Sequence, residues 1–213
     1  MAVIFAFGDS ITYGSKGTVS GGWCTLLRNH VDQKNAKDPN TYIRLYNLGI
    51  PGEATDTAVK RFLPELNARG RRDEEYIFII AFGANDACFI PSRQELNVSV
   101  EDFTKNIQQM VGYAKDASQK IVLLNITPVV DELTVSPVGK DRSRINKRYE
   151  AYNKELARIA KDHDLTFIDV NSAFTSQDYR KLLSDDGLHP NDNGHQLMFD
   201  LISEQIDKFL SNT

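Results

Sequence analysis

Short apolar runs alternate along the chain with longer segments in which apolar residues recur every three or four positions. The short runs predict buried strands at 3–7, 43–48, 76–82, 121–126 and 166–169. The longer segments predict helices near 22–35, 54–69, 101–118, 141–162 and 192–210. This alternation predicts an α/β fold in which five parallel strands form one sheet with helices on both faces.

The clearest helical face lies in the fourth predicted helix. Its apolar residues are spaced four, three, four and three apart, namely Ile145, Tyr149, Tyr152, Leu156 and Ile159. Pro64 falls inside the second predicted helix, and because proline has no N–H we expect it to kink or restart that helix.

Composition is that of an ordinary globular protein, with 41% hydrophobic and 25% charged residues among 213. We expect a single domain over residues 1–213. The formal net charge of -4 and the short runs of like charge argue against nucleic acid as a partner. Cys24 and Cys88 predict neither a disulfide framework nor a metal site.

Membrane and export signals are weak in this sequence. No segment approaches the ~20 apolar residues that a membrane span needs. The apolar start of the chain lacks a preceding basic region, so we expect a cytoplasmic protein. A secreted protein whose leader had been removed would show the same pattern.

Polar residues follow the first predicted strand, in Gly8-Asp9-Ser10. Ligands of parallel sheets bind beyond the carboxyl ends of the strands, so Ser10 is a candidate nucleophile at that edge. Asp9 and Ser10 are also common turn and cap residues, and for Asp9 we keep that structural interpretation. The G-x-S-x-G elbow of other serine hydrolases is absent, because Thr12 occupies its last position.

Two further loops follow predicted strands and supply hydrogen-bond donors. Gly52 offers a backbone N–H after the second strand, and Asn85 offers a side-chain NH2 after the third. Either residue alone is an ordinary turn former. Near the C-terminus, Asp186 and His189 lie three residues apart in a predicted loop.

Acyl transfer needs a nucleophile, a base, a carboxylate that orients the base, and donors for the oxyanion. The predicted edge provides all four: Ser10 attacks, His189 accepts its proton, and Asp186 orients the imidazole. The oxyanion hole is then formed by the N–H groups of Ser10 and Gly52 with the Asn85 side chain.

These residues resemble the ordered sequence blocks of the SGNH, or GDSL, hydrolase family. The resemblance spans residues 8 to 190, and its blocks are Gly8-Asp9-Ser10, Gly52, Gly83-Ala84-Asn85-Asp86 and Asp186-Gly187-Leu188-His189-Pro190. Ile11 replaces the leucine of the older family name. The resemblance implies a flavodoxin-like three-layer α/β/α sandwich, ester hydrolysis through an acyl-enzyme, and no metal or organic cofactor.

Several residues compete for these roles. We expect structural roles for His30, His163 and His195, and of these only His195 is a rival base worth testing. Asp185 is an alternative to Asp186, which spacing and resemblance favour. Trp23 is expected to pack beneath the Ser10 loop, with a platform for acyl or sugar groups as the alternative.

The leading hypothesis is therefore a serine esterase acting on a small-molecule, glycan or lipid ester, with a short acyl group such as acetyl. The alternatives are a lysophospholipase or thioesterase of the same family, and a non-catalytic module that binds a sugar or acyl chain. A nucleotide-binding protein is disfavoured because no G-x-G-x-x-G or Walker loop is present. The oligomeric state is not encoded in any recognisable pattern.

Three loops are expected to select the substrate, at 14–22, 88–98 and 128–140. The third predicts a modest apolar wall through Val129, Val130, Leu133, Val135 and Val138.

Overall fold

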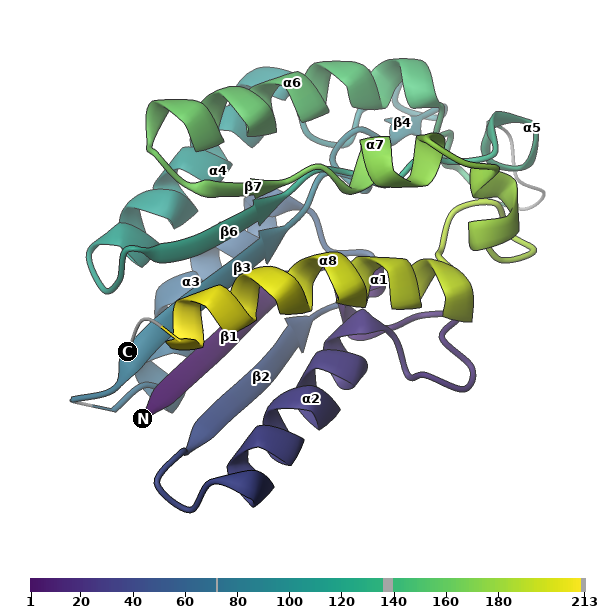
Figure 1. Ribbon diagram of the computed structural model, residues 1–213. Helices are drawn as coiled ribbons and strands as arrows, with labels where there is room; N and C mark the ends of the chain where they lie inside the picture. Colours follow the sequence, from purple (N-terminus) through teal and green to yellow (C-terminus); the bar gives the residue numbers. More distant parts are fainter. Residues whose placement is uncertain (72, 136–139, 212–213) are drawn as a thin grey trace.

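The computed structural model describes residues 1–71, 73–135 and 140–211. Its main sheet has five parallel strands in the order β2-β1-β3-β6-β7 (Figure 1). The strands are β1 (Ala2–Gly8), β2 (Ile43–Gly49), β3 (Glu75–Ala81), β6 (Lys120–Leu124) and β7 (Thr166–Ile168). Strand β2 lies on one side of β1, and β3, β6 and β7 follow in chain order on the other side. Flavodoxin-like folds have this strand order.

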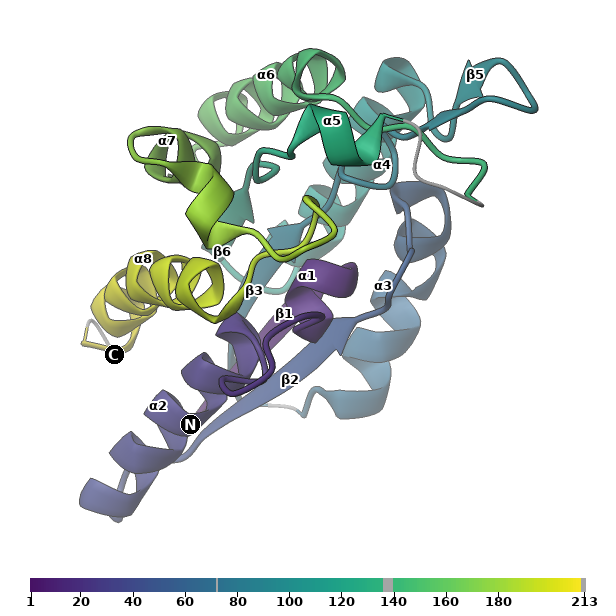
Figure 2. The same ribbon diagram turned by 90° about the vertical axis from the view of Figure 1, so that its right-hand side faces the viewer.

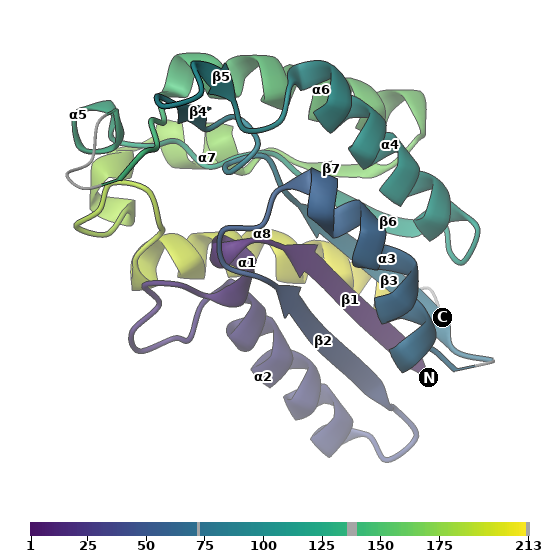
Figure 3. The same ribbon diagram turned by 180° about the vertical axis from the view of Figure 1, so that it is seen from behind.

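Helices cover both faces of this sheet, so the predicted three-layer sandwich is confirmed. One face carries α3 (Thr55–Arg69), α4 (Val100–Lys115) and α6 (Asn146–Asp162), whose buried residues share one core. Helices α3 and α4 lie toward the viewer in Figure 3. The other face carries α2 (Trp23–Lys37) and α8 (Asp192–Ser211). The shorter elements are α1 (Ser10–Tyr13), α5 (Asp131–Thr134), α7 (Val170–Thr175), the 3-10 helix η1 (Tyr179–Leu182), and the hairpin strands β4 (Phe89–Ile90) and β5 (Glu95–Leu96).

Strand β1 is buried along its whole length, and its side chains alternate between the two layers. Phe5 and Phe7 belong to the core under α3, α4 and α6, whereas Ile4 and Ala6 belong to the core under α2 and α8. Burial on both faces explains why this strand is a continuous apolar run rather than an alternating one.

Two expectations about helices were wrong. Helix α6 begins at Asn146 instead of 141, because Ser143 exchanges two backbone hydrogen bonds with Phe89, at 2.8 and 2.9 Å. Ile145 is extended and precedes the helix, so it is not part of the helical face. The alternative in which helix α3 restarts at Pro64 is wrong, because the helix continues through it. Both Pro64 and Lys60, whose carbonyl loses its helical partner, are exposed to water.

Strand register aligns the carboxyl ends at which the chemistry was predicted. Gly8, the last residue of β1, pairs with Gly49 of β2 and with Ala81 of β3. The loops that follow these strands therefore leave the sheet at the same level. Figure 2 looks onto this end of the sheet, where α1, α5 and the segment before α8 face the viewer.

Within the described residues, no helix combines the length and apolarity that crossing a membrane requires.

The close approach of α1 to the sheet requires glycine at position 8. A Cβ on Gly8 would lie 2.0 Å from Thr12 Oγ1 and 2.8 Å from the Ala81 carbonyl oxygen. We predict that Gly8→Ala lowers the free energy of unfolding by about 1–3 kcal/mol, the usual cost of overpacking. Urea unfolding of Gly112→Ala provides the matched control. Nothing lies within 4 Å of a Cβ at that helical position, so it should stabilise the protein by about 0.5–1 kcal/mol. Equal effects of the two substitutions would contradict this packing.

Candidate active site

Ser10 is held at the carboxyl end of β1 as the first residue of α1. The carboxylate of Asp9 caps this short helix, because its Oδ1 accepts a hydrogen bond of 2.9 Å from the Ile11 N–H. This matches the structural role expected for Asp9. The sharp change from strand to helix leaves the Ser10 side chain at the end of the sheet.

A hydrogen-bonded chain links Ser10 to two residues at the other end of the sequence. The Ser10 hydroxyl donates to His189 Nε2 at 2.8 Å, and His189 Nδ1–H donates to Asp186 Oδ2 at 2.7 Å. The tautomer is assigned from these bonds: since the carboxylate can only accept, Nδ1 carries the proton and Nε2 has a free lone pair. The structure thus brings together the three residues that the sequence proposed as a triad.

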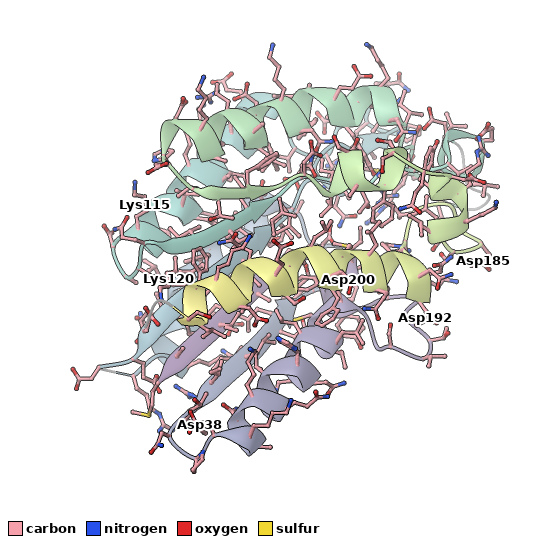
Figure 4. All side chains as sticks on the ribbon, in the orientation of Figure 1. Asp38, Lys115, Lys120, Asp185, Asp192 and Asp200 are labelled. Atoms are coloured by element: carbon pink, nitrogen blue, oxygen red, sulfur yellow. The ribbon has the colours of Figure 1, made fainter. Side chains whose placement is uncertain are left out.

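Asp186 is held as a carboxylate by its surroundings. Partial burial opposes its ionisation, but hydrogen bonds from the His189 ring, the N–H groups of His189 and Leu188, and the Ser184 hydroxyl outweigh burial and lower the pKa of Asp186. The rival Asp185 instead pairs with Lys16 at 2.9 Å. Figure 4 places Asp185 beside Asp192 at the end of the molecule opposite Lys115 and Lys120.

Gly52 adopts φ of +82°, a conformation that glycine reaches without steric cost, and lines the same cavity as Ser10. Among the described residues, neither the Gly52 N–H nor the Ser10 N–H donates to another backbone group. The Ser10 N–H is free because the first N–H groups of a helix have no partner within that helix. Both are therefore available donors at the predicted oxyanion position.

Asn85 lines the cavity but its carboxamide is already engaged. Its Nδ2 donates to the Glu53 carbonyl oxygen at 3.0 Å and, more weakly, to Asp9 Oδ2 at 3.3 Å. Its Oδ1 accepts from Arg144 Nη2 at 2.9 Å. The amide orientation follows from these bonds, since the guanidinium can only donate. Asn85 is thus rigid, and only its longer hydrogen bond is easily given up to another acceptor.

The cavity over Ser10 and His189 has a volume of about 550 Å³. Among the described residues that line it, Pro51 and Leu188 are the only apolar side chains. The expected apolar wall is wrong for its described members, because Val129 and Val130 are buried in the core and neither Leu133 nor Val135 lines the cavity. Residues 136–139, which include Val138, lie outside the described residues.

Where the apolar wall was expected, the cavity has a cationic wall that the sequence patterns did not predict. Lys140, Arg142 and Arg144 all line the cavity. The expected helix over 141–162 would have placed Arg142 and Arg144 on different faces. In the extended segment that pairs with Phe89, residues two apart project to the same face. The basic residues two apart, Arg142 and Arg144, were therefore the signal in the sequence, but they indicate one face only if this segment is extended.

The other histidines take structural positions. His195 is buried, accepts a hydrogen bond from the Trp23 N–H at Nδ1, and donates from Nε2 to the Ser15 carbonyl oxygen at 3.1 Å. Burial lowers the pKa of His195, and both ring nitrogens are engaged, so it is not a base for Ser10. His30 pairs with Asp207 and His163 caps α6. Trp23 is fully buried, as expected for core packing.

Comparison with known proteins identifies the family. The model of the GDSL-like lipase/acylhydrolase family matches residues 6–197, which include Ser10, Asn85 and His189. The chain belongs to this family. It is therefore a carboxylic ester hydrolase of the GDSL, or SGNH, type, as its sequence blocks had predicted.

Relatives of this GDSL hydrolase are similar over nearly its whole length. It is 28% identical to the isoamyl acetate-hydrolyzing esterase 1 homolog of Homo sapiens, over 98% of this chain and 83% of that protein. It is 27% identical to the isoamyl acetate-hydrolyzing esterase of Saccharomyces cerevisiae, over 95% and 85%. The crystal structure of a lipase/acylhydrolase from Enterococcus faecalis matches with a TM-score of 0.76 and 25% identity, over 97% and 95% of the two chains.

Two carboxyl groups of this GDSL hydrolase are buried behind the site. Burial raises the pKa of Asp9 to about 6 and that of Asp86 to about 7. Asp86 Oδ1 accepts from the Thr55 N–H and hydroxyl, which fixes the start of α3 after the Gly52 loop. Its Oδ2 is buried and has no hydrogen-bond partner in the described part of the chain. No cluster of metal-ligating side chains is present among the described residues.

Asp86 should make stability depend on pH. Its carboxyl pKa is about 7 when folded, against an ordinary value of 3.8, so between these values the folded protein holds a proton that the unfolded chain has released. Protonation of Asp86 favours the folded state at low pH, and this contribution to the free energy of unfolding is lost as pH rises toward 7. We predict that Asp86→Asn gains on the order of 3 kcal/mol relative to wild type between about pH 5 and 8, since each pKa unit is worth about 1.4 kcal/mol.

Chemical denaturation at about pH 5 and about pH 8 measures the difference in free energy of unfolding between Asp86→Asn and wild type. Asp38→Asn is the matched control, because hydrogen bonds from the Asn40 N–H and the Thr41 hydroxyl lower the pKa of Asp38. That carboxyl group is ionised throughout this range, so its contribution should stay constant. A constant difference for Asp86→Asn as well would show that Asp86 is not buried as described.

Proposed function

We propose that this esterase hydrolyses short-chain carboxylic esters through an acyl-enzyme formed on Ser10. The observation that carries the proposal is the unbroken hydrogen-bonded chain from Ser10 through His189 to Asp186, at 2.8 and 2.7 Å. These distances are those of a nucleophile within reach of its base and of a base within reach of its orienting carboxylate.

In the first half of the reaction, the Ser10 oxygen attacks the ester carbonyl while His189 Nε2 accepts the hydroxyl proton. The imidazolium that forms is stabilised by the Asp186 carboxylate, which stays ionised. His189 then gives this proton to the departing alcohol oxygen, leaving the acyl group on Ser10. In the second half a water molecule replaces the alcohol, and the same transfers release the acid and restore Ser10.

The oxyanion of each tetrahedral intermediate is assigned to three donors: the N–H groups of Ser10 and Gly52 and the Asn85 Nδ2. The first two are free, and Asn85 contributes by exchanging its long contact with Asp9 for the oxyanion. Arg144 holds the other end of the carboxamide, so this donor needs no reorientation during the reaction.

A short acyl group is supported by the cavity and by the relatives. Pro51 and Leu188 offer too little apolar surface to bury a long chain, among the residues that the structure describes. The human and yeast relatives carry names that refer to isoamyl acetate, an acetyl ester. A lysophospholipase or thioesterase would instead need an extended apolar channel.

We predict that Ser10→Ala and His189→Ala each lower kcat by about 10⁴–10⁶, because members of a triad act as one unit. The assay is hydrolysis of p-nitrophenyl esters from acetyl to palmitoyl, with the highest kcat/KM at acetyl or butyryl. His195→Gln serves as the matched control, since this histidine does not reach Ser10.

Each part of this assay can contradict the proposal. Full activity of His189→Ala would refute the mechanism, and an optimum at long chains would favour a lysophospholipase or thioesterase. No hydrolysis by wild type, with a bound sugar or acyl ligand, would favour the non-catalytic module.

For Asn85, we predict that replacement by alanine lowers kcat by about 10²–10³ with little change in KM, as for other oxyanion-hole donors. The substitution also removes hydrogen bonds to Glu53 and Arg144, so thermal unfolding of the variant must accompany the kinetics. A folded variant with an altered KM and an unchanged kcat would make Asn85 a binding residue instead.

A further inference from the structure

Arg144 is the most unusual charged residue at the site. It is 6% exposed, and its guanidinium donates only to uncharged groups, from Nε to the Ala84 carbonyl oxygen and from Nη2 to Asn85 Oδ1. An arginine has five N–H donors, so three of them have no partner among the described residues. Since Arg144 also lines the cavity, these donors are available to a ligand there.

Two other partly buried arginines of this protein are neutralised. Arg44 pairs with Glu74 and Arg61 pairs with Glu53, and both glutamates are nearly buried. Burial of a charge is costly unless an opposite charge accompanies it, and this protein meets that requirement elsewhere. Arg144 forms no ion pair among the described residues, and its nearest negative group is the buried Asp9 carboxyl on the other side of Asn85. An anion in the cavity would give the guanidinium a directly bonded partner.

Arg142 extends the same charge toward the catalytic serine. Its Nη1 lies 4.0 Å from the position of a Cβ on Gly52, and no described carboxylate forms an ion pair with it. Lys140, two residues earlier in the chain, also lines the cavity. The opposing charge is Asp141, whose carboxylate accepts from the N–H and hydroxyl of Ser92. The segment as a whole thus presents an excess of positive charge beside the oxyanion donors.

We propose that Arg142 and Arg144 form an anion subsite, so that this esterase prefers esters bearing a carboxylate or phosphate near the scissile bond. The inference rests on the proposed function for its kinetic consequence. The guanidinium groups bind the anionic group through charge-assisted hydrogen bonds and position the ester carbonyl over Ser10. Hydrolysis itself is unchanged: water adds across the ester bond, and an acid and an alcohol are released.

The test compares matched anionic and neutral esters. For an anion on the alcohol side, 4-acetoxybenzoate is compared with 4-acetoxybenzamide. For an anion on the acyl side, the monoanionic 4-nitrophenyl adipate is compared with 4-nitrophenyl hexanoate. The quantity measured is the ratio of kcat/KM for the anionic ester to that for the neutral one. Dividing the wild-type ratio by that of a variant cancels the intrinsic reactivity of the esters.

In at least one of the two pairs, Arg142→Gln is expected to lower this ratio about tenfold, the size of one charge-assisted hydrogen bond. Arg144→Lys should lower it as well, because lysine keeps the charge but loses the planar fork. The wild-type preference should shrink between about 0.05 and about 0.5 M salt. Arg158→Gln is the matched control: this exposed arginine of α6 pairs with Glu155 and Asp162, so the ratio should not change.

Binding separates this inference from the proposed function. Calorimetry on Ser10→Ala should show tighter binding of the anionic member of the preferred pair, and addition of Arg142→Gln should remove the difference. If wild type hydrolyses both members of each pair and no ratio responds to Arg142→Gln, the anion subsite is refuted while the esterase stands. If no ester is hydrolysed, equal binding of both members by Ser10→Ala refutes the subsite independently.

Discussion

Pairing of β1 with β2 on one side and β3 on the other is the constraint on which the site depends. Gly8 lies level with Gly49 and Ala81, so the three following loops start at one height. Ser10 is two residues beyond this level, and the loops after β2 and β3 bring Gly52 and Asn85 to the same cavity. A shift of one residue in β1 would also exchange its two apolar faces, so burial in both cores fixes the register that positions Ser10.

Side chains behind the cavity then hold these loops in place. Asp9 caps α1 beneath Ser10, Asp86 binds the start of α3, and Asn97 Nδ2 donates to the Asn85 carbonyl oxygen at 3.1 Å. Asp192, at the start of α8, binds the N–H groups of Val19 and Ser20 at 3.1 and 2.9 Å. The residues proposed to meet the substrate are therefore supported by a second group of polar contacts, which keeps the proposed donors and nucleophile in fixed positions without the substrate.

Sequence patterns predicted the sheet and the residues that follow its strands for one physical reason: buried parallel strands are continuous apolar runs, and their carboxyl ends share an edge. Ser10, Asn85 and His189 could therefore be proposed from the order of residues along the chain. Arg142 and Arg144 could not, because a helical period was continued to residue 141 where pairing with Phe89 makes the backbone extended. That pairing joins segments more than fifty residues apart, so nothing local shows that the alternating basic residues lie on extended backbone. Pro64 was misjudged for the related reason that its exposure to water, which removes most of its cost, depends on how α3 packs.

The central claim is that Ser10 is the nucleophile and is activated by His189. The most direct measurement is covalent labelling with a fluorophosphonate probe, followed by the intact mass of the protein and by peptide mapping. The account predicts one adduct per chain, on the peptide that contains Ser10, with labelling lost in Ser10→Ala and greatly slowed in His189→Ala. An adduct on any other residue, or equal labelling of the Ser10→Ala protein, would contradict it.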